Sequence, residues 1–188
     1  MAERRTRREG LAFEGDVRLV IIGELNKGDM LPKSPLEFFN PLRSMVQRTS
    51  LTDIPGVKII YTVNAFIPDD SKTCRVEAKK WEAISKKLDG ITVVGISKEH
   101  HQAIAAFAQR EGITHQLLSA KNGPIAQELA AELEGPGNWP DMLLREVIVA
   151  DENNIVVYKG EVSNQEDEPP YDPPVEAATT ALRTSAAS

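Results

Sequence analysis

Two short apolar runs separated by an amphipathic segment constrain the fold of this chain more than any other feature. Residues 57–63 and 91–96 have the length and the β-branched composition of buried strands. Between them, Trp81, Ile84 and Leu88 recur at helical spacing. This order of strand, helix and strand predicts a parallel β-α-β unit, because parallel strands need a long crossover connection.

Further elements extend this pattern toward both ends of the chain. Apolar runs on either side of Gly15-Asp16 predict an N-terminal hairpin over residues 11–20, whereas segment 36–51 is mixed because its prolines oppose a long helix. The other predicted elements are helices at 75–88, 99–110, 124–133 and 175–182, a strand at 114–118, and a closing hairpin of 145–150 with 155–162. We therefore expect an α/β protein with a central mixed β-sheet and helices on both faces.

The length and the composition fit one compact domain. The 188 residues are 41% hydrophobic but only 5% aromatic, so we expect a core of Ile, Val, Leu and Ala. The domain is predicted to span residues 11–182, between a disordered basic tail at 1–10 and a C-terminal tail at 183–188. No apolar segment follows the arginines of the basic tail, so we expect no export signal.

Charge and cysteine usage argue against several classes of function. The formal net charge of −6 opposes a general nucleic-acid surface. One cysteine excludes an internal disulfide framework and fits a reducing cytoplasm. No apolar run approaches the ~20 residues that span a bilayer, so we expect no membrane partner.

No motif in the sequence predicts a cofactor or a metal. The glycine-rich loops that bind nucleotides and the Gly-x-Ser-x-Gly motif of hydrolases are both absent. The adjacent His100 and His101 point in different directions along a helix, and no carboxylate or cysteine completes a site with them. We therefore expect neither this histidine pair nor the later His115 to bind a metal. We expect the pair to lie at a solvated helix start.

The single cysteine, Cys74, lies where the predicted central strand passes through a polar turn into a helix. Ligand sites of α/β proteins tend to lie beyond the carboxyl ends of strands. The free N–H groups at a helix start also favour the thiolate, which is the nucleophilic form of the side chain. The alternative is an inert, buried cysteine, which is the usual role of a free thiol. The polar neighbours from Asp70 to Arg75 weaken that alternative.

Arg145 is a second candidate because it starts a strongly apolar strand. An inward-facing guanidinium needs a partner, since an unpaired buried charge is very costly. A thiolate is one such partner. A position at the rim of the sheet, or a pair with Glu146 or Asp141, is the alternative, and the strand position by itself leaves both open.

Four short motifs occur here in the order and spacing of a known family. Residues 28–32 match a Gly-Asp-x-x-Pro loop, and residues 51–56 match a Leu-x-Asp-x-x-Gly turn. The run Ser71-Lys72-Thr73-Cys74 matches the second half of the motif Pro-x-x-x-Thr/Ser-x-x-Cys. Arg145, followed by an apolar strand and an acidic turn, matches a family arginine. Over about residues 11–180 the chain resembles the peroxiredoxins, most closely their thiol peroxidase branch.

The resemblance implies a thioredoxin-like fold with an additional N-terminal β-hairpin. It implies reduction of hydrogen peroxide or organic hydroperoxides, with Cys74 as the peroxidatic nucleophile. Arg145 would hold the thiolate, and the Ser71 hydroxyl would hydrogen-bond the peroxide. Thr73 and Pro68 are expected to line the substrate site. No cofactor is implied, and homodimers are expected.

The chain departs from the family pattern at two positions. Ile67 stands where the shielding proline belongs, and the proline follows one residue later, at Pro68. Gly95 and the segment 98–110 lack the resolving cysteine that the branch usually carries there. With no second cysteine in the sequence, an external thiol must regenerate the first, and it would be a small molecule or a thioredoxin-like protein.

Two other functions remain open from the sequence. A non-catalytic redoxin-like protein, which binds a partner or senses oxidants, could keep the same fold, and the two departures favour it. A disulfide exchanger is disfavoured because no Cys-x-x-Cys motif exists. The leading hypothesis is a one-cysteine peroxidase.

Overall fold

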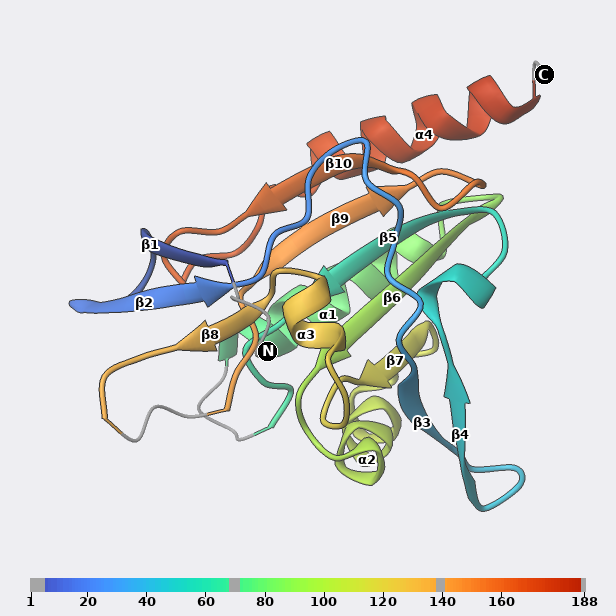
Figure 1. Ribbon diagram of the computed structural model, residues 1–188. Coiled ribbons are helices and arrows are strands. Elements are labelled where there is room, and N and C mark those ends of the chain that lie inside the picture. The colour runs from blue at the N-terminus through green and yellow to red at the C-terminus, as the bar shows by residue number, and fades with distance from the viewer. Residues whose placement is uncertain (1–5, 68–71, 138–140, 187–188) are drawn as a thin grey trace.

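A seven-stranded mixed sheet forms the centre of the computed structural model, which describes residues 6–67, 72–137 and 141–186 (Figure 1). The strand order is β10-β9-β5-β6-β7-β3-β4. The strands are β3 (Leu36–Asn40), β4 (Met45–Thr49), β5 (Val57–Thr62), β6 (Ile91–Ser97), β7 (Gln116–Ser119), β9 (Glu146–Ala150) and β10 (Val156–Glu161). The strands β5, β6 and β7 are parallel, and the other neighbouring pairs are antiparallel, which confirms the predicted mixed sheet.

A smaller sheet with the order β1-β2-β8 covers part of one face of the large sheet (Figure 1). Its hairpin consists of β1 (Arg7–Glu14) and β2 (Val17–Ile22), which pair antiparallel as predicted. The hairpin begins at Arg7 rather than Leu11, because Arg7 pairs in register with Ile22. Part of the expected basic tail is therefore strand.

The predicted helix over residues 124–133 is wrong. Helix α3 (Ile125–Glu128) is four residues long, and the chain then turns through Ala130, whose φ of 59° lies in the left-handed region. The next residues form β8 (Glu132–Glu134), in which Leu133 pairs with Ile21 of β2. Pairing with the hairpin buries Leu133, and this long-range contact outweighs the local helical preference.

Three longer helices complete the domain: α1 (Lys72–Ser85), α2 (His101–Glu111) and α4 (Asp172–Ala186). Helix α2 begins after His100, which accepts a hydrogen bond from the Gln102 N–H, and ends at Gly112 with a φ of 69°. His100 is exposed at the helix start, as expected, whereas His101 is buried near Glu37, so only half of the histidine pair is solvated. Helix α4 is longer than predicted at both ends, and it includes Pro173 and Pro174 in its first turn, where a missing N–H is tolerated.

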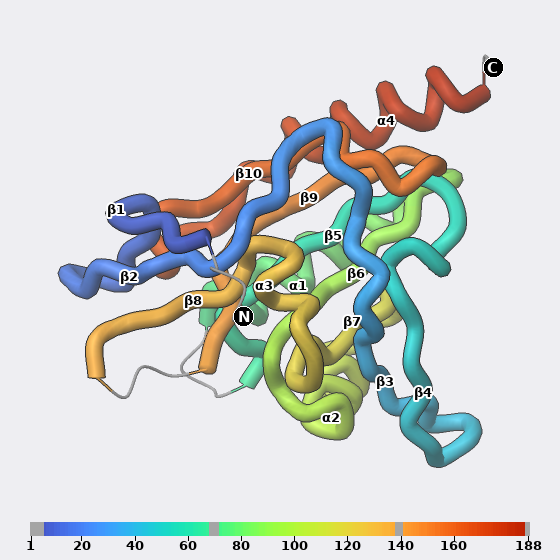
Figure 2. The backbone as a smooth tube through the Cα atoms, in the orientation of Figure 1, coloured from blue at the N-terminus to red at the C-terminus, as the bar shows by residue number. Residues whose placement is uncertain are grey.

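The core divides into two layers, one on each face of the large sheet. Alternate residues of β5 point to opposite faces, so Ile59 and Tyr61 join α1, α2 and α4, whereas Ile60 joins α3 and the hairpin. The connection from β2 to β3 crosses the second face, as the tube in Figure 2 shows, and buries Leu25 and Leu31 there. Helices therefore lie on both faces of the sheet, as predicted, although in the described residues the second face carries only the four-residue α3.

The neighbours of Gly95 on β6 leave room only for glycine at this position, on the face of the sheet that carries α1, α2 and α4. Gly95 pairs in register with Tyr61 of the adjacent strand. A Cβ atom at position 95 would lie 2.5 Å from both Cζ and Oη of Tyr61 and 2.6 Å from Cδ2 of Leu117. The tyrosine ring therefore fills the space that any larger residue, including a cysteine, would need.

We predict that Gly95→Ala lowers the free energy of unfolding by about 1–3 kcal/mol, because the added methyl group overpacks this contact. Chemical denaturation of both proteins measures the change. In a Leu117→Ala background the additional cost of Gly95→Ala should be smaller, since that change opens space beside the new methyl group. A Gly95→Ala midpoint equal to that of the wild type would contradict the packing described here.

Candidate active site

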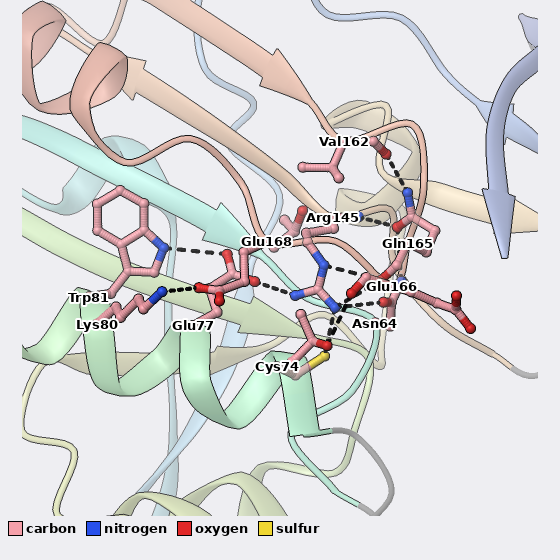
Figure 3. A network of polar contacts seen from close by, with 12 residues as sticks. Asn64, Cys74, Glu77, Lys80, Trp81, Arg145, Val162, Gln165, Glu166 and Glu168 are labelled. Atoms are coloured by element: carbon pink, nitrogen blue, oxygen red, sulfur yellow. Dashed lines mark hydrogen bonds and ion pairs between the residues drawn. The ribbon is translucent and has the colours of Figure 1, made fainter. Parts of the chain in front are cut away.

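Cys74 and Arg145 lie in contact in the buried interior. Cys74 is the third residue of α1, Arg145 directly precedes β9, and each is 1% exposed. The Nη2 group of Arg145 donates a hydrogen bond to Sγ of Cys74 over 3.1 Å (Figure 3). The strands explain this proximity, because the end of β5 pairs with the start of β9 and α1 follows β5. The rim position considered for Arg145 is thereby excluded.

The guanidinium of Arg145 is satisfied by a full set of acceptors. Its Nη1 group pairs with a carboxylate oxygen of Glu77, one turn after Cys74 on α1. Its Nη2 group also donates to Oδ1 of Asn64 over 3.0 Å and to the backbone carbonyl of Gln165 over 3.1 Å. Glu77, rather than Glu146 or Asp141, is therefore the anionic partner. A charge this deeply buried is tolerated only with such a complete set of partners.

Gln165 joins the loop after β10 to the rest of the site. Its Oε1 atom accepts hydrogen bonds from the Arg145 backbone N–H over 2.7 Å and from Nδ2 of Asn64 over 3.0 Å. Its amide nitrogen donates to the carbonyl of Val162. The Asn64 amide also donates to the carbonyl of Leu143, so one network links β5, β9 and the last loop (Figure 3).

Sequence reasoning did not predict Glu77, Asn64 or Gln165 as parts of this site. Glu77 carried one usable signal, since a residue three positions after Cys74 lies on the same face of a helix. Asn64 lies two residues after the end of the central strand, which is a weaker signal. Gln165 carried none, because it lies in an acidic, proline-rich segment with no periodic pattern.

Complete burial raises the pKa of Glu77 to about 7, although the Arg145 guanidinium and the Trp81 indole N–H both favour its charged form. The indole donates to Oε1 of Glu77 over 3.3 Å. Arg145 stays protonated, as arginine does in proteins. One guanidinium thus faces both the sulfur of Cys74 and the carboxyl group of Glu77. When Glu77 carries a proton, the positive charge of the guanidinium is left beside the sulfur.

Of the remaining predicted site residues, the structure describes Thr73 but not Pro68 or Ser71. The Thr73 hydroxyl donates to the carbonyl of Glu166 over 3.1 Å, so it ties the start of α1 to the loop after β10. Pro68 and Ser71 lie outside the described residues, and their roles stay predictions. The chain that leads to them is fixed by Glu99, whose carboxylate accepts the backbone N–H groups of Phe66 over 2.5 Å and Ile67 over 2.8 Å.

Two further observations concern the described part of the chain only. It contains no group of three or more His, Cys, Asp or Glu side chains that could hold a metal ion. Its helices are too short or too polar to cross a membrane.

We predict that the stability of the wild type depends on Glu77 in the acidic range. Its folded-state pKa of about 7 exceeds its ordinary value of 4.5, so the folded state binds more protons between these limits. This group's contribution to stability is therefore lost as the pH rises from about 4.5 to 7, by on the order of 3 kcal/mol. Denaturant unfolding at several pH values measures the slope.

Glu77→Gln should flatten this part of the pH profile because the amide does not titrate. Glu176→Gln is the matched control, since Glu176 is exposed on α4. A Glu77→Gln profile parallel to that of the wild type would show that Glu77 keeps an ordinary pKa in the folded protein.

The chain is similar in sequence to known proteins. The AhpC/TSA family profile matches residues 28–159. A thiol peroxidase from Corynebacterium glutamicum is 31% identical over 135 residues, which cover 71% of this chain and 80% of that protein. A thiol peroxidase from Bacillus subtilis is 26% identical over 175 residues, which cover 92% of this chain and 98% of that protein.

Solved structures share the fold. A peroxiredoxin-like protein from Aquifex aeolicus has a TM-score of 0.77 at 20% identity, over 93% of this chain and 99% of that one. A thiol peroxidase from Chromobacterium violaceum has a TM-score of 0.72 at 19% identity, over 93% of this chain and 96% of that one. The motifs, the fold and these matches agree, and the chain belongs to the AhpC/TSA family, in its thiol peroxidase-like branch of the peroxiredoxins.

Proposed function

We propose that this protein is a thiol-dependent peroxidase that reduces hydrogen peroxide or organic hydroperoxides through Cys74 alone. The 3.1 Å contact between the Arg145 guanidinium and Sγ of Cys74 carries the proposal. A buried cation beside a thiol favours the thiolate, which is the nucleophile that peroxide reduction requires. Membership of the AhpC/TSA family supports the same chemistry.

In the first step, the Cys74 thiolate attacks the terminal oxygen of the hydroperoxide. A sulfur–oxygen bond forms while the oxygen–oxygen bond breaks. The leaving alkoxide or hydroxide takes a proton and departs as an alcohol or as water, and the sulfur becomes a sulfenic acid. Arg145 can stabilise both the thiolate and the charge that develops on the peroxide, because its Nη2 group points at the sulfur.

We assign supporting roles at the substrate to the residues of the motif. The Ser71 hydroxyl would hydrogen-bond the second peroxide oxygen, and Pro68 would line the site. The backbone N–H groups near Thr73 and Cys74 would stabilise the leaving oxygen, since N–H groups in the first turn of a helix have no partners within the helix.

In the second step, an external thiol attacks the sulfenic sulfur of Cys74 and releases water, and a second thiol then resolves the mixed disulfide. The sequence contains no other cysteine for an internal route. Cys74 is 1% exposed, so the small peroxide can approach more easily than a thiol reductant. The Thr73–Glu166 contact is one restraint that would have to open for the reductant. We also propose a homodimer and a cytoplasmic location, from the family resemblance and the lone thiol.

A non-catalytic redoxin-like protein is the second candidate function. The specific observation in its favour is Gly95, because the packing of Tyr61 leaves no room there for the resolving cysteine of the branch. A sensor would form the sulfenic acid once and pass the signal on, whereas a peroxidase would turn over. Multiple turnovers with excess thiol distinguish the two.

We predict that substoichiometric hydrogen peroxide adds one oxygen atom to the wild-type protein at Cys74. Intact-mass measurement detects the addition, and a small thiol should reverse it. Cys74→Ser should consume peroxide no faster than buffer, because the nucleophile is gone. Unchanged consumption by Cys74→Ser would exclude the proposed mechanism, and a single turnover in the wild type would favour the sensor.

We predict that Arg145→Lys lowers kcat/KM for peroxide by roughly 10- to 100-fold, the effect of losing one hydrogen bond to a charged group. Lysine keeps the positive charge but has no planar fork to reach Cys74, Glu77 and Gln165 together. Initial rates at several peroxide concentrations give the ratio. Arg43→Lys is the matched control because Arg43 is exposed. Equal ratios in both variants would remove Arg145 from the mechanism.

A further inference from the structure

A second buried group of hydrogen-bonded side chains lies beside the candidate active site, and the proposed peroxide chemistry does not use it. Tyr61 on β5 is 0% exposed, and its hydroxyl lies 2.8 Å from Nε2 of His115. The other ring nitrogen, Nδ1 of His115, lies 2.8 Å from Oε2 of Glu82. The side chains of His115 and Glu82 are 4% and 8% exposed. Phenol, imidazole and carboxylate thus form a continuous line of short hydrogen bonds.

The surroundings decide which atoms carry the protons in this line. Burial would raise the pKa of Glu82, but hydrogen bonds from Thr114, Lys86 and His115 outweigh it and hold the pKa well below its usual value. Burial lowers the pKa of His115, which is therefore a neutral imidazole at neutral pH. The Glu82 carboxylate can only accept, so Nδ1 of His115 carries the proton and Nε2 accepts the phenolic O–H.

Aromatic rings connect this line to the protein surface. Tyr61 stacks on Trp81, with ring centroids 5.7 Å apart and an interplanar angle of 22°. Trp81 packs edge-on against Tyr171 at 5.1 Å, and Tyr171 is half-buried at the start of α4. The Trp81 indole also donates to the carboxyl group of Glu77, which would stabilise positive charge on the indole (Figure 3).

From this geometry we infer a second redox centre, in which Tyr61 is a one-electron donor and His115, held by Glu82, accepts its proton. Through Trp81, Tyr61 gives one electron to a one-electron oxidant, such as a thiyl radical. Its phenolic proton moves to Nε2 of His115. The products are a neutral tyrosyl radical, an imidazolium whose Nδ1–H is held by Glu82, and the reduced oxidant.

The electron and the proton leave Tyr61 together because an unsolvated charge in the protein interior has a high free energy. Removing an electron from a buried phenol without removing its proton would leave an unsolvated positive charge beside Trp81. His115, whose Nε2 lies 2.8 Å from the phenolic oxygen, accepts the proton and with it the positive charge. The Glu82 carboxylate then balances the charge of the imidazolium. This site moves one electron and one proton, whereas Cys74 transfers two electrons to a peroxide, so the two chemistries can be tested separately.

The chain is well suited to a direct test because it contains three tyrosines: Tyr61, Tyr158 and Tyr171. Photochemical oxidation with ruthenium(III) tris-bipyridine, generated by a flash in the presence of a quencher, supplies the one-electron oxidant. High-field electron paramagnetic resonance then detects tyrosyl radicals and reports whether the phenolic oxygen accepts a hydrogen bond. The full-length protein should give a long-lived tyrosyl signal with the shift of a hydrogen-bonded radical.

Tyr61→Phe should abolish this hydrogen-bonded signal, and Tyr158→Phe, the matched control, should keep it. His115→Gln should form the radical roughly tenfold more slowly, as the loss of a charge-assisted hydrogen bond predicts. Circular dichroism must show that each variant is folded. An unchanged signal in folded Tyr61→Phe, a wild-type radical confined to tryptophan, or unchanged kinetics in folded His115→Gln would each overturn the inference.

Discussion

The buried guanidinium of Arg145 is the interaction on which the site and much of its scaffold depend. Removing one partner of a buried ion pair typically costs about 3–5 kcal/mol, because the other charge remains without water. Arg145 therefore requires its acceptors, which come from Glu77, Asn64 and Gln165. These partners come from α1, from the end of β5 and from the loop after β10, so one charge holds three segments that are far apart in sequence.

The same charge carries the chemistry that we propose for the site. Cys74 reaches the guanidinium over 3.1 Å, and Glu77 shares it with a pKa raised to about 7. Glu77 also accepts the Trp81 N–H, and Trp81 stacks on Tyr61. The proposed two-electron centre and the proposed one-electron centre are thus joined through a single carboxyl group. Gly95 links packing to the proposed mechanism as well, because Tyr61 occupies the space that a resolving cysteine at position 95 would need.

The sequence predicted the elements whose patterns are local and strong. The strands at 57–62 and 91–97 and both hairpins agree with the structure, and the helix predicted at 75–88 is present as α1, which begins and ends three residues earlier. It failed at 124–133, where the residues are compatible with a helix until Leu133 pairs with Ile21, more than a hundred positions away. It found Cys74 and Arg145 as candidates, but it paired neither with Glu77 or Gln165, because no local pattern encodes contacts between distant segments.

The sequence by itself determined an α/β fold, a lone thiol at a helix start and an arginine at the head of an apolar strand. These follow from periodicity, composition and short motifs, which act over a few residues. The tertiary structure alone decided that the arginine faces inward, that Glu77 neutralises it, and that Tyr61 faces His115. Such contacts join residues up to 81 positions apart, and the pairing of β5 with β9 and, through β6, its proximity to β7 bring them within hydrogen-bond distance. Burial then sets their charge states, because it removes the water that would otherwise solvate each group alone.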